Sequence, residues 1–321
     1  MQRAFVSGGS GFVGRRLIAA LRGRGVEVRA LARSSGAQRS VADLGAEPVA
    51  GDLDAVPLDA LRGCDAVFHL AAVTDLSKSR AEFMRVNVDG TRHLLEQTRA
   101  AGAGRFVHCS TEAVLVGAGP IVRADETRQP LDRPPGLYPL TKAHAERAVL
   151  DAVARGQDAV IVRPRFVWGK GDTTLMPRLL EAMKRGRWAW LGGGAQLTST
   201  CHVANACEGL MLAAEKGKPG EIYFVTDGEP ARVKDFMTAM VATQGVTPQD
   251  RKLPFGLAYA LATVVDGVWG LFRLRGEPPL SRTAVLLIGQ EVTVDDRKAR
   301  RELGYRAEMS VEAGLAEMQA A

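Results

Sequence analysis

The sequence predicts an α/β fold in which a doubly wound parallel sheet is joined to a smaller, mostly helical C-terminal lobe. Six apolar, β-like runs are separated by stretches with helical spacing, and they occupy residues 3–7, 26–32, 47–50, 65–71, 105–110 and 158–163. Such alternation is typical of a parallel sheet with helices on both faces. The second observation is a glycine-rich turn directly after the first run, Gly9-Ser10-Gly11-Phe12-Val13-Gly14.

The glycine turn joins a predicted strand to an amphipathic helix, and the run at 26–32 completes a βαβ unit. Glycine permits the tight turn, lets the backbone approach a pyrophosphate and allows the helix to pack close to the strand. The N-terminus of the helix offers unpaired N–H groups and the positive end of its dipole. A flexible loop without a ligand is the alternative, but the flanking strand and helix favour a dinucleotide site.

The later runs fit the same sheet. Parallel strands are buried on both faces and should be apolar almost throughout, as the run at 65–71 is. Ligands of such sheets bind at the carboxyl ends of the strands. From about Trp168 the pattern loosens into helices, short strands and Gly/Pro turns, so we expect a nucleotide-binding domain over 1–166 and a substrate-binding lobe over 167–321.

Length and composition are those of an ordinary globular chain. The 321 residues are 46% hydrophobic and 24% charged, with a net charge of +6. The charges are spread widely and no nucleic-acid motif accompanies them, so we expect no nucleic-acid partner. Four cysteines without C-x-x-C spacing, and no visible targeting peptide, favour a reduced, cytoplasmic compartment. Cys201, His202 and Cys207 lack the second close pair of a zinc site, so no metal is expected.

Tyr138 and Lys142 stand four residues apart at the start of a segment, 139–154, with helical character. Residues four apart lie on one face of a helix. A phenol titrates near pH ~10, so Tyr138 needs a pKa about 2–3 pH units lower, or roughly 3–4 kcal/mol, to exchange a proton near neutrality. A neighbouring ammonium and an oxidised nicotinamide ring would supply two positive charges. The spacing also occurs by chance on many helices, but the glycine turn upstream favours the catalytic interpretation.

Several motifs resemble those of the extended short-chain dehydrogenases/reductases. Gly8, Gly11 and Gly14 form the G-x-x-G-x-x-G version of the turn. The other motifs are Gly51-Asp52-Leu53, His69-Leu70-Ala71-Ala72, Asn87-Val88-Asp89-Gly90-Thr91, Arg163-Pro164 and Val167-Trp168-Gly169-Lys170-Gly171-Asp172. The resemblance implies a Rossmann fold, in which the strand-like run at 221–226 returns to the nucleotide-binding sheet.

The resemblance also implies the roles of individual residues. Tyr138 exchanges a proton with the substrate oxygen, while Lys142 lowers its pKa and holds the nicotinamide ribose. Thr111 takes the place of the catalytic hydroxyl, with Ser110 beside it; serine is commoner there, and the alternative is that both hydroxyls only satisfy backbone groups at a strand end. The residues expected to contact the cofactor are Gly8, Gly11, Phe12, Val13, Gly14, Arg33, Asp52, Leu53, Leu70, Ala71, Ala72, Asn87, Tyr138, Lys142 and Pro164. Those expected to contact the substrate are Thr111, Phe166, Val167 and Trp168.

The end of the second predicted strand indicates which cofactor is used. Enzymes that bind NAD(H) carry an acidic residue there, which holds the ribose 2′-hydroxyl. This chain has Ala32, followed by Arg33 and the hydroxyls of Ser34 and Ser35. We therefore expect NADP(H) to be favoured over NAD(H), and the alternative is that Arg33 is a plain surface arginine.

The second half resembles the 3β-hydroxysteroid dehydrogenase branch, which includes sterol-4-carboxylate 3-dehydrogenases and 2-alkyl-3-oxoalkanoate reductases. The motifs are Arg163-Pro164-Arg165, Leu274-Arg275-Gly276-Glu277-Pro278-Pro279-Leu280 and Val292-Thr293-Val294-Asp295-Asp296. The resemblance implies hydride transfer between a nicotinamide and a secondary alcohol or ketone of a small apolar substrate, a sterol or a long-chain keto or hydroxy acid. A nucleotide-sugar epimerase or dehydratase is the alternative, but it needs a polar second lobe, and 253–272 is mostly apolar. An inactive, cofactor-sensing relative is a third class, which the Tyr138/Lys142 pair disfavours.

The segment 253–272 is expected to form a mobile apolar cap over the substrate pocket, and 253–275, which includes the basic flank, is expected to touch a membrane as well. Arg251, Lys252, Arg273 and Arg275 flank it and suit anionic headgroups. Asp266 and three glycines argue that it lies on a bilayer rather than crossing it. The alternative is that it packs on the protein's own core. We also expect a homodimer that is cytoplasmic and peripheral at the inner face of the membrane.

Overall fold

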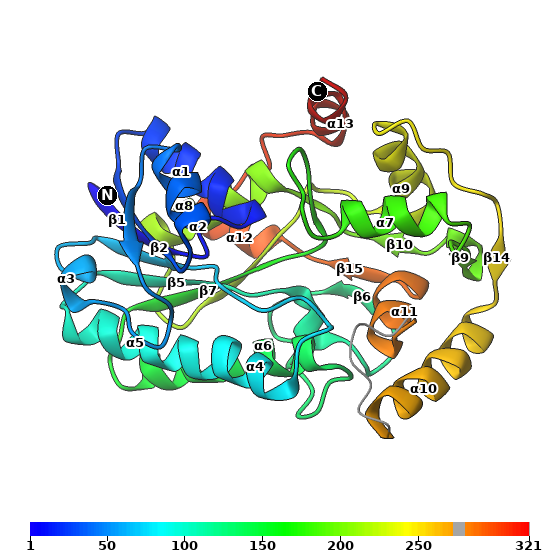
Figure 1. Ribbon diagram of the computed structural model, residues 1–321, viewed down its shortest axis with the longest axis horizontal. Helices are drawn as coiled ribbons and strands as arrows, with labels where there is room; N and C mark the ends of the chain where they lie inside the picture. Colours follow the sequence, from blue (N-terminus) through cyan, green and yellow to red (C-terminus); the bar gives the residue numbers. More distant parts are fainter. Residues whose placement is uncertain (272–279, 321) are drawn as a thin grey trace.

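The central element is a parallel sheet with the strand order β12-β7-β5-β4-β1-β2-β3 (Figure 1). The computed structural model describes residues 1–271 and 280–320, and the sheet has seven strands within them. They are β1 (Arg3–Ser7), β2 (Glu27–Ala32), β3 (Glu47–Ala50), β4 (Ala66–His69), β5 (Arg105–Cys109), β7 (Ala159–Pro164) and β12 (Ile222–Val225). The predicted doubly wound parallel sheet is therefore confirmed.

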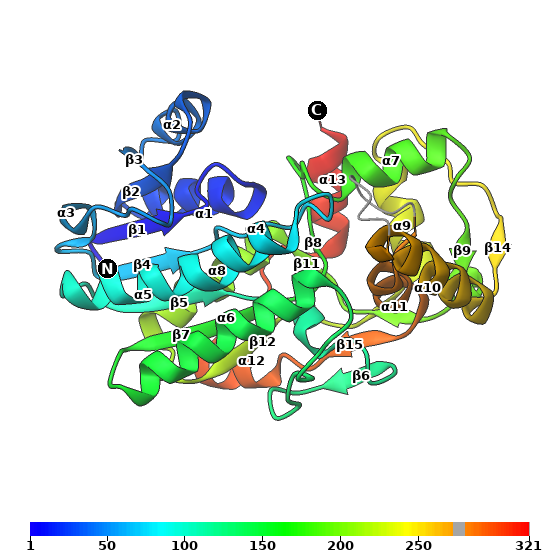
Figure 2. The same cartoon turned by 60° about the horizontal axis from the view of Figure 1, so that its bottom comes forward.

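Helices cover both faces of the sheet, as the two views in Figures 1 and 2 show. One face carries α1 (Phe12–Gly23), α2 (Ser35–Ala42), α8 (Val203–Lys216) and α12 (Arg297–Leu303). The other carries α3 (Leu58–Leu61), α4 (Arg80–Met84), a π-helical turn (Arg85–Asp89), α5 (Gly90–Ala100) and α6 (Leu137–Ala154). Both faces are apolar because the strands are buried on both sides, and β4 is buried at every position.

The remaining elements form a second region, to the right in Figure 1. Its helices are α7 (Met176–Lys184), α9 (Val233–Ala242), α10 (Phe255–Leu271) and α11 (Arg282–Gly289), while α13 (Val311–Gln319) lies near the C-terminus. Short strands accompany them: β6 (Ile121–Ala124), β8 (Val167–Trp168), β9 (Trp190–Leu191), β10 (Leu197–Thr198), β11 (Cys201–His202), β13 (Ala231–Arg232), β14 (Lys252–Leu253) and β15 (Val292–Val294). Two 3₁₀ turns are η2 (Glu112–Leu115) and η3 (Gly192–Gly194).

The chain crosses between the two regions more than once. The run expected at 221–226 is β12, and it pairs in parallel with β7, with Ile222 opposite Ile161. The loop before α6 is tied to β12 as well, because Glu126 Oε1 accepts a hydrogen bond from the backbone N–H of Phe224 at 2.9 Å. Burial raises the pKa of the Glu126 carboxyl.

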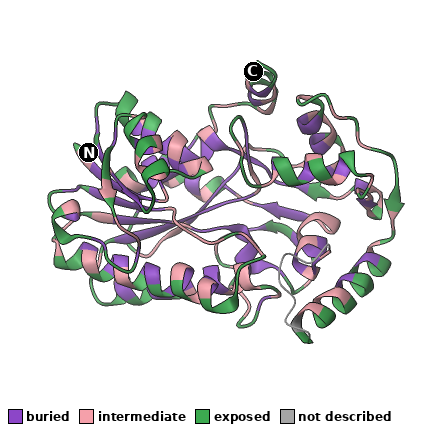
Figure 3. Cartoon of the chain, viewed as in Figure 1, coloured by how far each residue is buried: buried purple, intermediate pink, exposed green. Residues whose placement is uncertain are grey.

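Helix α10 packs on α11 through small side chains and leaves its large ones outside. Ala258 and Ala262 are buried against Val285, and Asp266 pairs with Arg282 at 3.0 Å. Five exposed aliphatic side chains follow helical spacing: Leu257 (52% exposed), Leu261 (47%), Val264 (65%), Val268 (38%) and Leu271 (78%); Tyr259 (37%) is exposed as well. Figure 3 shows α10 at the periphery, exposed along its outer side. We call these five residues the α10 stripe.

Part of the expected cap and of its basic flank lies outside the described residues. This part contains Arg273, Arg275 and all of the Gly-Glu-Pro-Pro motif. Among the helices that the structure describes, none is both long and apolar enough to cross a membrane.

Candidate active site

The glycine turn closes the carboxyl end of β1 against that of β4. Gly8 has φ +75°, and a Cβ there would lie 2.6 Å from the backbone nitrogen of Ala71. A Cβ on Gly14 would lie 2.1 Å from Gly8 O, and the N–H of Gly11 donates to the same oxygen at 3.0 Å. Only glycine fits the positions of Gly8 and Gly14, because any side chain would collide with backbone.

The N-terminus of α1 opens onto this turn. Its N-cap residue is Gly11, which has no side chain that could bond to the N–H groups of the first turn. Phe12 and Val13 in that turn are half-buried. The helix therefore presents backbone N–H groups where a phosphate can bind. Close by, Leu70 N donates to Ser7 O at 3.1 Å, which keeps the end of β4 next to β1.

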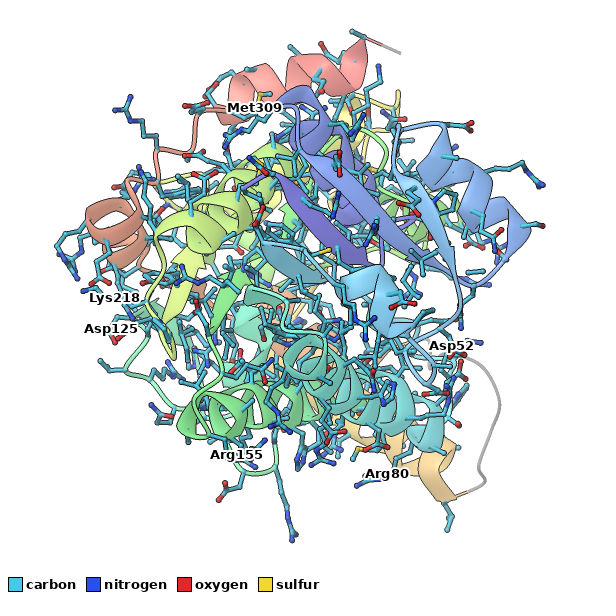
Figure 4. All side chains as sticks on the ribbon, turned by 90° about the vertical axis from the view of Figure 1, so that its left-hand side faces the viewer. Asp52, Arg80, Asp125, Arg155, Lys218 and Met309 are labelled. Atoms are coloured by element: carbon cyan, nitrogen blue, oxygen red, sulfur yellow. The ribbon has the colours of Figure 1, made fainter. Side chains whose placement is uncertain are left out.

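The residues expected around the adenosine lie at the ends of β2 and β3. Arg33 is exposed directly after β2, and Ser34 caps α2 by accepting a hydrogen bond from Ala37 N at 3.2 Å. Asp52 is half-buried after β3, and its Oδ1 accepts from Asp54 N at 3.0 Å. In Figure 4, Asp52 lies on the opposite side of the molecule from Asp125 and Lys218. Leu53 is buried and packs where a Cβ on Gly90 would be.

Asn87 has a bridging role in this structure. Its Oδ1 accepts from Val73 N at 2.7 Å, and its Nδ2 donates to Val73 O at 3.1 Å and to Thr141 Oγ1 at 3.0 Å. These bonds hold the segment after β4, which contains Ala71 and Ala72, against helix α6.

Helix α6 places Lys142 at the carboxyl end of β5. The Lys142 Nζ donates to Cys109 O at 2.8 Å and lies 3.1 Å from His108 Nε2. Burial lowers the pKa of Lys142 to about 8, while Cys109 and Glu146 oppose this shift. Burial holds the pKa of His108 well below its usual range, and the charge of Lys142 is the second cause. The imidazole is therefore neutral. The sequence analysis did not single out His108 as a partner of Lys142.

Tyr138 shares the first turn of α6 with Pro139 and is half-buried. Burial raises the pKa of the phenol above its usual value, the charges of Cys109 and Glu112 raise it further, and a hydrogen bond with Thr111 opposes them. The family resemblance implies that Lys142 lowers this pKa. In the structure Lys142 instead donates to the end of β5, so the phenol of the cofactor-free protein is protonated across the neutral range.

Thr111 and Ser110 follow β5 directly. Thr111 caps η2, with its Oγ1 accepting from Ala113 N at 3.2 Å, and the same hydroxyl donates to Glu112 Oε2 at 2.9 Å. The Ser110 hydroxyl is buried and has no hydrogen-bond partner among the described residues. The structure therefore brings Thr111, rather than Ser110, to Tyr138.

Three of the four residues expected to bind substrate, Phe166, Val167 and Trp168, follow β7 and differ in exposure. Pro164, expected to contact the cofactor, is buried at the end of β7, whereas Phe166 and Val167 are half-buried. Phe166 has φ +48°, a rare conformation for a bulky residue. Trp168 is fully buried, its Nε1 donates to Asp227 Oδ2 at 2.7 Å, and its ring packs on Phe236. Trp168 thus supports the second region from within.

Two buried ion pairs behind the site escaped the sequence analysis. Arg163 pairs with Glu146, and Arg165 pairs with Glu112, at 2.6 Å and 2.7 Å. The signal was present: a carboxylate directly follows the predicted catalytic hydroxyl, and two arginines flank Pro164. Charged residues inside an apolar region need partners, and each pair supplies one.

Comparison with known proteins agrees with this geometry. The model of the NAD dependent epimerase/dehydratase family matches residues 4–226. The chain belongs to this family. The residues present fit a pyridine nucleotide, since the turn at Gly8 and Gly14 admits no side chain and the first turn of α1 is open to a phosphate. A pyridine nucleotide is accordingly the cofactor of the site.

Curated relatives span nearly the whole chain. A 4-hydroxy-2-methyl-3-oxo-4-farnesyl-3,4-dihydroquinoline-1-oxide ketoreductase of Stigmatella aurantiaca is 46% identical over 98% of this chain and 94% of its own length. A 2-alkyl-3-oxoalkanoate reductase of Stenotrophomonas maltophilia is 33% identical, covering 99% and 98% of the two chains. A decarboxylating sterol-4-alpha-carboxylate 3-dehydrogenase of Dictyostelium discoideum is 32% identical, covering 99% and 100%. The resemblance to the branch that contains these dehydrogenases and reductases is confirmed.

A solved structure gives the same fold. MoeE5 in complex with UDP-glucuronic acid and NAD is 27% identical and superimposes with a TM-score of 0.74, covering 98% of this chain and 97% of that one. The chain is thus an oxidoreductase of the extended short-chain dehydrogenase/reductase type.

Proposed function

We propose that this protein interconverts a ketone and a secondary alcohol on an apolar substrate, with Tyr138 as the acid and base. The observation that carries the proposal is the meeting of Tyr138, Thr111 and Lys142 at the carboxyl end of β5, on the edge of the sheet that also holds the glycine turn. A pyridine nucleotide, when bound, would supply or accept the hydride.

In the reducing direction the Tyr138 hydroxyl donates its proton to the ketone oxygen as that oxygen gains negative charge. The raised pKa of the phenol suits this role, because the proton is present at neutral pH. Lys142, with a pKa of about 8, carries a positive charge at pH 7 at the same end of β5. The unpartnered Ser110 hydroxyl is a second donor for the same oxygen.

The substrate class follows from the relatives and from the second region. Relatives act on a farnesylated quinoline, on a 2-alkyl-3-oxoalkanoate and on a sterol carboxylate, as their names state. We infer a ring ketone with an isoprenoid chain, a sterol or a long-chain keto acid, with residues 167–321 forming the substrate lobe. The segment 253–272 is mostly apolar, which suits such a molecule better than the diphosphate of a nucleotide sugar, the substrate of the alternative epimerase.

Replacing Tyr138 with phenylalanine tests the function. Tyr138→Phe removes only the proton donor, so kcat should fall by about 10²-fold or more while cofactor affinity stays within about twofold. Tyr223→Phe, in the buried strand β12, is the matched control and should keep its turnover. Turnover is followed by nicotinamide absorbance with sterols, 3-oxo acids, farnesylated ketones and nucleotide sugars, and affinity by cofactor fluorescence.

Two outcomes contradict the proposal. Retention of more than about a tenth of the rate in Tyr138→Phe excludes Tyr138 as the proton donor. Turnover of nucleotide sugars alone supports the epimerase or dehydratase alternative.

For the cofactor we propose a preference for NADP(H). The end of β2 lacks the carboxylate that enzymes binding NAD(H) carry there. Arg33 is exposed at this place, and the Ser34 and Ser35 hydroxyls follow it. A guanidinium there matches the charge and geometry of a 2′-phosphate.

For partners we propose a homodimer in the cytoplasm that touches the inner face of the membrane through the α10 stripe. The stripe exposes five large aliphatic side chains in a helical row, and Arg251 and Lys252 precede the helix. Contiguous exposed apolar surface of this kind marks interaction sites. Basic flanks favour an anionic lipid surface as the partner.

A further inference from the structure

His69 in β4 and His108 in β5 are buried neighbours in the central sheet. They stand opposite each other in the paired strands, and their ring centroids are 5.3 Å apart. Their exposed fractions are 1% and 0%. A buried imidazole needs a hydrogen-bond partner at each of its two nitrogens. The two histidines differ in how this need is met.

His69 has a hydroxyl partner at each nitrogen. Its Nδ1 lies 2.7 Å from Ser7 Oγ, and its Nε2 lies 2.8 Å from Thr91 Oγ1. The Thr91 hydroxyl gives its one hydrogen to Asn87 O at 2.7 Å, so His69 Nε2 is the donor in the bond to Thr91. The polar groups of His69 are therefore satisfied within the fold.

Within the described residues His108 has a partner at one nitrogen, and that partner is Lys142. The Nε2 of His108 lies 3.1 Å from Lys142 Nζ. An ammonium can only donate, so Nε2 accepts and Nδ1 carries the ring hydrogen. The Nδ1 is buried without a hydrogen-bond partner in this part of the chain. A buried N–H without a partner destabilises a fold, and an apolar ring would avoid this loss but would offer Lys142 no acceptor.

The ionisable groups around Lys142 come from three elements. Cys109 in β5 and Glu146 in α6 favour its charged form, and its charge acts on His69 in β4. Glu146 is already engaged in a buried ion pair, and His69 is bonded to hydroxyls. The Nζ of Lys142 donates instead to Cys109 O at 2.8 Å and to His108 Nε2. Two consecutive residues of β5 therefore hold the ammonium.

We propose, on the basis of the proposed function, that His108 is a positioning residue: its Nε2 accepts a hydrogen bond from Lys142 and keeps the ammonium charged and in a fixed orientation at the carboxyl end of β5. An ammonium has three hydrogens at tetrahedral angles. Once Cys109 O and His108 Nε2 have accepted two of them, the direction of the third is determined, and a bound group can accept it. A hydrogen bond to the charged form of a buried group also favours that form.

The first measurement is the pKa of Lys142 itself, by NMR of protein labelled with [¹³Cε]lysine, with Lys142→Met to assign the signal. His108→Phe keeps a ring and removes the acceptor, so the pKa of Lys142 should fall by about 1–2 pH units. His108→Gln carries an amide oxygen at the level of Nε2 and should return this pKa to within about half a pH unit of wild type. His69→Phe is the matched control, because it removes an equally buried imidazole that bonds to Ser7 and Thr91, and it should leave the pKa of Lys142 unchanged.

The second measurement is the pH profile of kcat/KM for the cofactor, which reports ionisation in the free enzyme. In wild type, kcat/KM should fall as the pH rises past about 8, where Lys142 loses its proton. In His108→Phe the fall should begin about 1–2 pH units lower, so that kcat/KM is about two- to tenfold below wild type at pH 7 and approaches it toward about pH 5.5. His108→Gln should restore the wild-type profile.

An unchanged pKa of Lys142 in His108→Phe would overturn the inference. A loss of kcat/KM that is equal at every pH would overturn it as well, because it would show a purely structural role. Should His108→Phe fail to fold, His108→Leu replaces it in both measurements. Failure of the proposed function is distinguishable, since it appears as an active Tyr138→Phe, whereas the NMR titration needs no turnover. An inactive Tyr138→Phe together with an unchanged pKa of Lys142 refutes the inference about His108 alone.

Discussion

Removal of the Lys142 charge should stabilise the cofactor-free protein while abolishing its activity. The ammonium is buried, and its pKa falls from 10.5 to about 8. At about 1.36 kcal/mol per pH unit, this difference corresponds to about 3 kcal/mol by which the fold disfavours the charged form at pH 7. Lys142→Met keeps the aliphatic stem and removes the charge, but it also removes the bond to Cys109 O. We therefore expect the free energy of unfolding to rise by about 1–3 kcal/mol at pH 7.

The pH dependence has a definite sign. Between pH 8 and pH 10.5 the unfolded chain still holds the Lys142 proton and the folded chain has lost it. Stability rises with pH wherever the unfolded state binds more protons. The penalty from Lys142 is thus complete below about pH 8 and disappears toward pH 10.5, so the advantage of Lys142→Met over wild type should shrink across this window.

Urea unfolding followed by circular dichroism at pH 7, 8.5 and 10 measures this advantage. Lys184→Met, at an exposed position of α7, is the control, and its difference in stability from wild type should not change across the pH range. A Lys142→Met protein that is less stable than wild type at pH 7, or whose difference from wild type does not change up to pH 10, would refute the reasoning.

Two further predictions concern the surface. Arg33→Ala should lower kcat/KM for NADP(H) by about tenfold or more and leave kcat/KM for NAD(H) within about twofold, because only the 2′-phosphate loses a partner. Both values are measured by nicotinamide absorbance, and a preference for NAD(H) in wild type and variant alike excludes this role of Arg33. Leu261→Glu/Val264→Glu should abolish co-sedimentation with vesicles containing phosphatidylglycerol while leaving the mass in sedimentation equilibrium that of a dimer. If wild type does not bind these vesicles, the membrane contact is wrong, and if the variant becomes a monomer, the α10 stripe is the dimer surface.

The sequence was sufficient for the central sheet because its signals are local. The alternation of buried runs and helical stretches and the glycines at the first turn determine β1, α1 and β2 without reference to distant residues. The spacing of Tyr138 and Lys142 likewise predicted a shared face of α6. The roles assigned to the cofactor-binding and substrate-binding residues remain predictions.

The electrostatics of the site depended on contacts that the sequence does not reveal. His108 and Lys142 are in contact although they are 34 positions apart in the sequence. Arg165 and Glu112 are 53 positions apart and form an ion pair. Burial raises the pKa of the Tyr138 phenol, and the spacing of residues in the sequence does not reveal burial. Glu126 likewise is half-buried and bonded to β12, a contact between residues 98 positions apart.

The position of β12 means that the chain cannot be divided at the boundary between its two parts. In a fragment that ends at residue 166, β7 would become an open sheet edge, although all six of its residues are buried in the intact protein. The helices α8 and α12, which cover one face of the sheet, would be missing as well. Unpaired apolar edge strands are templates for aggregation. Swapping the substrate specificity of this fold by recombination therefore requires exchanging the loops between β7, β12 and α12 and leaving these three elements in place.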